Sequence, residues 1–107
     1  MTTPNIISID GTDYVRADSI PKPSGPVRIV VLQRGWVVVG YYAEDGDDVT
    51  VSSASVIRVW GTTKGLGELV DGPTPATRLD KSGTVRAHRG AVVLTLDADE
   101  DAWRSLL

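Results

Sequence analysis

The chain has 107 residues, no cysteine and a formal net charge of −3. This length suits one domain with one modest core, and the lack of cysteine excludes disulfides and thiolate metal sites. The negative charge argues against indiscriminate binding to nucleic acid. No apolar run reaches the roughly 20 residues of a membrane helix. No signal peptide is visible after Met1, so we expect a cytoplasmic protein in its host cell and no membrane partner.

The first 26 residues are predicted to form two short segments outside the main sheet. An Asp10-Gly11 pair between two short apolar stretches predicts an N-terminal hairpin over residues 1–20. Three prolines among residues 20–26 remove backbone donors. They predict an extended connector over residues 21–26.

Residues 27–97 carry the strand signals of a small barrel. Their apolar runs are rich in β-branched residues, which favour strands, and an acidic, glycine-containing stretch at 44–48 predicts a hairpin turn. This stretch lacks the pattern of a calcium-binding EF-hand loop. Short strands with turns every eight to twelve residues or so predict a mainly β fold, a partly open barrel of the Sm/SH3-like type. The strands are expected at residues 27–32, 36–42, 49–51, 56–60, 84–88 and 91–96, with a turn at 52–55.

Two short helices are expected beside the barrel. Residues 65–70 suit an internal helix, in which Glu68 would cap the first turn. Residues 98–107 suit a C-terminal helix opened by a capping box from Asp97 to Glu100. Trp103 with Leu107, at a spacing of four residues, would then pack on a partner surface.

Few side chains suggest catalysis or metal binding. His88 is the only histidine, and no serine, cysteine or second histidine stands at a recognisable catalytic spacing from it. We expect His88 at the surface or at a strand edge, and Trp36 in the core. The sequence therefore predicts no enzyme, no cofactor and no metal site.

The glycine-rich stretch at residues 61–67 is the candidate ligand site. It does not match a P-loop or a dinucleotide fingerprint. Its glycine backbone can still approach an anion closely, and the Thr62 and Thr63 hydroxyls and the Lys64 ammonium can bind phosphate oxygens. A helix beginning near Gly65 would present free N–H groups to the same anion. The alternative is a loop that needs glycine only for its backbone geometry.

Basic and aromatic residues surround this stretch. Strand alternation places Arg58 and Trp60 on one face and Ile57 and Val59 on the other. Trp60 would then either stack a nucleobase beside Arg58 or close one end of the barrel. The complete set of predicted ligand residues is Arg58, Trp60, Gly61, Thr62, Thr63, Lys64, Gly65, Arg78 and Arg86.

Two resemblances add to this interpretation. Residues Val27 to Gly61 resemble the Sm-like small-barrel pattern, with Gly35, Gly40 and Ala54 at comparable places and Gly46-Asp47 where that pattern has Met-Asn. The blocks VVLQRGWVVVG and VIRVWGTTKGLGEL resemble a largely uncharacterised family of small phage and prophage proteins. The second resemblance implies an accessory factor that acts on the host.

These observations lead to one expected function and two alternatives. The expected function is a phage accessory protein that sequesters a small phosphorylated ligand, a nucleotide or a cyclic nucleotide host-defence signal, without chemistry. Its pocket would be completed in a homo-oligomer. The first alternative is an Sm-like module that binds RNA or DNA. The second is a protein-interaction role in which the C-terminal helix docks on a partner.

Overall fold

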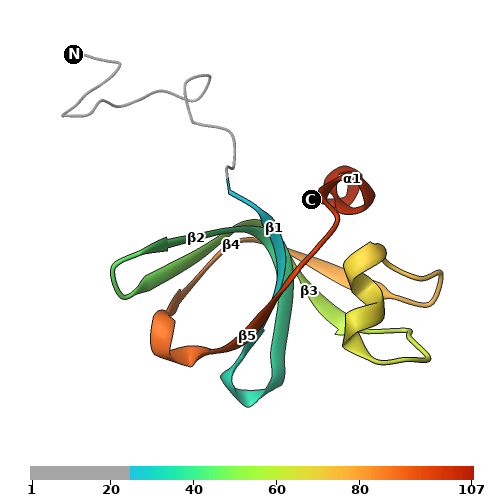
Figure 1. Cartoon of the computed structure of the whole chain (residues 1–107), viewed down its shortest axis with the longest axis horizontal. Coiled ribbons are helices and arrows are strands. Elements are labelled where there is room, and N and C mark those ends of the chain that lie inside the picture. The colour runs from blue at the N-terminus through green and yellow to red at the C-terminus, as the bar shows by residue number, and fades with distance from the viewer. Residues whose placement is uncertain (1–24) are drawn as a thin grey trace, which may run out of the picture.

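The computed structural model describes residues 25–107, which form five antiparallel strands and several short helices (Figure 1). The strands make one sheet in the order β4-β3-β2-β1-β5. The sheet curls without closing, so the predicted partly open, mainly β barrel is confirmed. The expected N-terminal hairpin and most of the connector lie outside the described residues. The elements are β1 (Val27–Leu32), η2 (Gln33–Gly35), β2 (Trp36–Asp45), β3 (Asp48–Val59), η3 (Leu66–Asp71), β4 (Arg78–His88), η4 (Arg89–Ala91), β5 (Val92–Asp97), α1 (Glu100–Trp103) and η5 (Arg104–Leu106).

The curled sheet buries apolar side chains on both of its faces. Alternate residues of a strand point to opposite faces, so Ile29 and Val39 belong to one cluster and Val30 and Val38 to the other. The first cluster is made by Val27, Ile29, Val37, Val39, Ile57, Leu69 and Trp103. The second is made by Val30, Val38, Tyr42, Val49, Val51 and Ala54.

A bend in β2 and β3 lets one sheet serve both clusters. The pairing register shifts between Val39 and Tyr41, and Ser53 has a φ of 50°. A Cβ atom at Gly40 would lie 2.7 Å from the Ser52 carbonyl oxygen, so only glycine allows this close approach. The serine-rich residues 52–55 therefore do not form the predicted turn. They form a bulged part of one continuous strand, β3.

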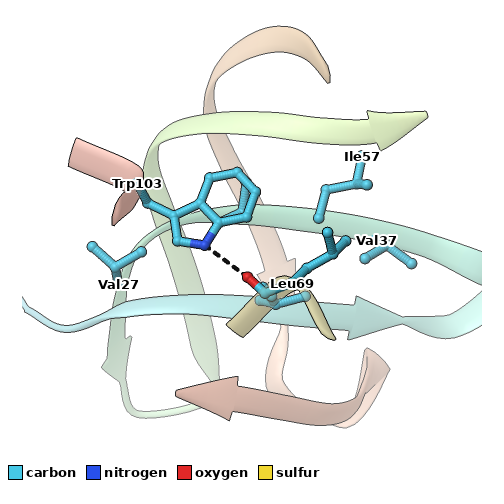
Figure 2. Close-up of a cluster of buried hydrophobic side chains, with 7 residues drawn as sticks. Val27, Val37, Ile57, Leu69 and Trp103 are labelled. Atoms are coloured by element: carbon cyan, nitrogen blue, oxygen red, sulfur yellow. Dashed lines mark hydrogen bonds between the residues drawn. The ribbon is translucent and has the colours of Figure 1, made fainter. Parts of the chain in front are cut away.

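The C-terminal segment covers the first cluster. Figure 2 shows the Trp103 ring among Val27, Val37, Ile57 and Leu69. The ring is fully buried, and its Nε1–H donates a hydrogen bond to the Leu69 carbonyl oxygen at 2.9 Å. The Asp99 N–H also bonds to the Val70 carbonyl oxygen, at 2.8 Å. These contacts join α1 to η3 over the sheet.

Three expectations about aromatic and capping residues are wrong. Trp103 packs on the chain's own core, because η3 and the sheet leave an apolar surface there, so it does not face a partner. Trp36 is 57% exposed, since it begins β2 opposite Leu32 at the β1–β2 turn, where its face of the sheet is no longer covered. The cap of α1 is Asp99, whose side chain accepts from the Asp101 N–H at 3.0 Å. Asp97 instead ends β5 and pairs with Arg28.

Replacing Trp103 should therefore destabilise the whole protein. We expect Trp103→Ala to lower the free energy of unfolding by about 3–5 kcal/mol, because it removes a fully buried aromatic side chain and leaves a cavity. Urea unfolding followed by circular dichroism measures this change. Trp36→Ala is the matched control and should cost less than about 1 kcal/mol, since this side chain is exposed. Equal midpoints for the two variants would contradict the assignment.

Candidate functional site

The predicted ligand residues lie at two separate places. All of them except Arg86 lie at the end of β3, in the glycine-rich loop that follows it, and at the start of β4. We call this region, residues 58–65 and 74–78, the glycine-loop end. Arg86 lies near the far end of β4 and pairs across the strands with Thr50. The structure thus keeps most of the predicted site together and removes Arg86 from it.

The glycine-loop end is anchored by two threonines that sequence reasoning missed. The Thr77 hydroxyl donates to the Trp60 carbonyl oxygen at 2.7 Å, and the Thr74 hydroxyl donates to the Gly61 carbonyl oxygen at 2.6 Å. Gly61 has a φ of 68°, and a Cβ atom there would lie 2.4 Å from the Ala76 carbonyl carbon. Gly61 is therefore needed for backbone geometry, whatever the loop binds.

The amide groups of this loop converge on a carboxylate. The Thr63 and Lys64 N–H groups donate to Glu68 Oε1 at 3.1 and 3.0 Å. Glu68 lies in η3, which has six residues and follows Gly65. Glu68 was expected to cap the first turn in a bond to the N-cap Gly65, but its carboxylate instead accepts from the two residues before Gly65. The prediction that the start of η3 offers free N–H groups to an anion stays a prediction. The loop can bind an anion, and its own glutamate supplies that anion here.

The aromatic and basic groups around the loop differ in their availability. Trp60 is 41% exposed, so its side chain is partly accessible to solvent, and both interpretations of it, base stacking and closure of a barrel end, stay predictions. Arg58 is also exposed, and its guanidinium pairs with Asp80 at 2.8 Å. The Arg78 guanidinium donates to two backbone carbonyl oxygens of its own loop, each at 3.0 Å. The exposed Lys64 ammonium makes no ion pair with any of residues 25–107.

A separate group of polar side chains from β1, β2 and η4 lies around Tyr42. The Tyr42 hydroxyl donates to Glu44 Oε2 at 2.7 Å, and Arg89 pairs with the same carboxylate. The Arg28 guanidinium lies 4.9 Å from the centre of the Tyr42 ring. Burial, followed by the hydrogen bond to Glu44, raises the pKa of Tyr42. The same hydrogen bond lowers the pKa of Glu44 below its usual value.

Comparison with known proteins finds neither a protein-family model nor a curated protein that matches this chain. The likenesses to Sm-like barrels and to phage proteins therefore stay predictions, as does the ligand site. Within residues 25–107, no helix has the length and apolar character to cross a membrane. The same residues contain no group of three His, Asp or Glu side chains that could hold a metal ion.

The Tyr42 hydroxyl should make stability depend on pH in the alkaline range. Its pKa is raised in the folded state, so the stabilisation is fully present below its unfolded value of about 10 and is lost as the pH rises through the folded value. We expect the free energy of unfolding of the wild type to fall above about pH 10, and that of Tyr42→Phe to fall less.

Urea unfolding across this pH range measures the difference, and ultraviolet absorbance of tyrosinate reports the ionisation directly. Tyr41→Phe is the matched control and should retain the late ionisation of Tyr42. The same alkaline loss of stability in Tyr42→Phe as in the wild type would assign the effect to other groups.

Proposed function

We propose that this chain is a non-enzymatic binding protein whose glycine-loop end holds the phosphate of a small phosphorylated ligand. The observation that carries this proposal is the convergence of the Thr63 and Lys64 N–H groups on Glu68 Oε1. Two amides already arranged around one anionic oxygen can receive a phosphate oxygen in its place. Glu68 would then leave the loop when the ligand enters.

The neighbouring side chains suit the rest of a nucleotide. The Lys64 ammonium would pair with the phosphate, and the Thr62 and Thr63 hydroxyls can donate to its other oxygens. The half-exposed ring of Trp60 offers a surface on which a base can stack. Arg58 and Arg78 add positive charge at the same end of the barrel.

Such a protein would act by affinity and stoichiometry. In the phage setting implied by the sequence resemblance, we propose that it sequesters a nucleotide or a cyclic nucleotide host-defence signal in the host cytoplasm. We further propose a homo-oligomer in which a neighbouring subunit completes the pocket. Both statements rest on the proposed ligand class.

Binding of RNA or DNA is the second candidate function. Exposed Trp60 beside exposed Arg58 favours it, since aromatic rings and guanidinium groups together bind single strands. The two functions differ in their salt dependence. A nucleic-acid module would bind oligonucleotides of many lengths with an affinity that falls steeply with salt, whereas a pocket would prefer one small molecule.

The test is calorimetric titration of the full chain with a panel of nucleotides and cyclic nucleotides. Lys64→Ala should weaken binding by about tenfold or more, because it removes a charge-assisted hydrogen bond to phosphate. Glu68→Gln should strengthen binding, because a neutral amide competes less well than a carboxylate for the loop N–H groups.

Lys81→Ala, a change at an exposed lysine in the middle of β4, is the matched control and should leave the affinity unchanged. Native mass spectrometry of protein purified from cells would give the ligand-to-subunit ratio. Unchanged affinity in Lys64→Ala, or no uptake of any compound in the panel, would overturn the proposal.

A further inference from the structure

A second polar site lies at the opposite end of the β3–β4 pair from the glycine-loop end. It is a hollow of about 330 Å³ in the surface, and a volume near 300 Å³ is at the lower end for small-molecule sites. Its lining residues come from the beginning of β3 and the end of β4. They are Asp48, Thr50, Arg86, Ala87 and His88.

The strand register explains why these side chains meet. Asp48 pairs directly with His88, and Thr50 pairs directly with Arg86. Directly opposite residues project from the same face of a sheet, and so do residues two apart on one strand. The four polar side chains therefore form a square on one face. Val49 lies between Asp48 and Thr50 and points to the buried second cluster, which holds the strand in place.

Three of these side chains can act as hydrogen-bond donors. The Gly90 N–H donates to Nδ1 of His88 at 2.8 Å, so the proton of the neutral ring is on Nε2. The Arg86 guanidinium and the Thr50 hydroxyl are also donors. Only Asp48 offers a charged acceptor. Asp45, which pairs with Asp48 across the β2–β3 turn, adds a second carboxylate on that side.

The two opposite charges in this hollow do not pair with each other. Asp48 and Arg86 are diagonal neighbours across the strands, yet no ion pair joins them, and neither pairs with another of residues 25–107. Arg58 and Arg104 differ in this respect, since both form ion pairs with aspartates at 2.8 Å. The hollow thus presents a positive group, Arg86, and a negative group, Asp48, on neighbouring strands.

The presence of both a positive and a negative group in one hollow determines which class of ligand fits it. A simple anion would be attracted by Arg86 and repelled by Asp48 and Asp45. A simple cation would be attracted by the two aspartates and repelled by Arg86. A zwitterion compensates both sides at once. We propose that this hollow binds a free α-amino acid, with its carboxylate on Arg86, His88 Nε2–H and the Thr50 hydroxyl, and its ammonium on Asp48. This site does not depend on the ligand proposed for the glycine-loop end.

The test is titration of the full chain with glycine, L-alanine and L-glutamine, followed by backbone amide chemical shifts in NMR spectra. We expect saturable shifts at Thr50, Arg86 and His88. Acetate and methylammonium each carry only one of the two charges and should bind at least about tenfold more weakly. Arg86→Gln and Asp48→Asn should each lower the affinity for the amino acid by about tenfold or more.

Lys81→Gln is the matched control, because Lys81 is an exposed basic residue of the same strand and belongs to neither proposed site, and it should bind like the wild type. Equal affinity in Arg86→Gln and the wild type would overturn the proposal. Inorganic phosphate that shifted the Thr50, Arg86 and His88 amides with a tighter affinity than all three amino acids would also overturn it and indicate an anion site at the hollow. Absence of saturable shifts up to about 50 mM of each amino acid would overturn it as well.

Discussion

The Trp103 side chain joins the C-terminal segment to the internal η3 turn, and the glycine-loop end depends on this contact. Its ring fills the first cluster while its Nε1–H bonds to the Leu69 carbonyl oxygen. Leu69 directly follows Glu68, so the contact that fixes η3 over the sheet also fixes the carboxylate that the loop amides hold. Loss of the Trp103 anchor would therefore free both the core surface and the anion that now occupies the loop. The stability of the core and the position of the Glu68 carboxylate are therefore linked through one side chain.

The bend at Gly40 and residues 52–55 determines where the other polar hollow lies. β3 is one continuous strand on both sides of this bend. Its first residues, before the bend, pair with the last residues of β4. Val49 and Val51 bury one face of this part of β3 in the second cluster, which leaves the opposite face to Asp48 and Thr50. The two candidate sites therefore rest on different halves of the core. A substitution in one site therefore does not touch the residues of the other.

Local sequence patterns predicted the features that are determined by residues close together in the chain. The apolar, β-branched runs at 27–32 and 36–42 are strands because their alternation matches a half-buried sheet. The pattern also indicated that Glu68 would bond back to the start of its own turn, and the structure places that bond at Thr63 and Lys64 and not at Gly65. The errors concern faces and distant partners. Whether Trp36 or Trp103 is buried depends on which face η3 and α1 cover. The serine-rich residues 52–55 look like a turn unless the bulge opposite Gly40 is known.

Contacts between residues far apart in the chain also explain why the hollow at Asp48 and His88 could not be predicted. Their side chains are brought together by the β3–β4 register, which a single sequence does not reveal. In the glycine loop, the proposed ligand would have to displace Glu68, so its affinity would be set by the competition of two anions for the same amides. At the hollow, no described residue pairs with Arg86 or Asp48, so a ligand that carries both charges gains contacts without first breaking an ion pair there. The two proposals thus differ in one physical respect: the loop amides already hold a carboxylate of the chain, whereas the charges of the hollow have only water to leave.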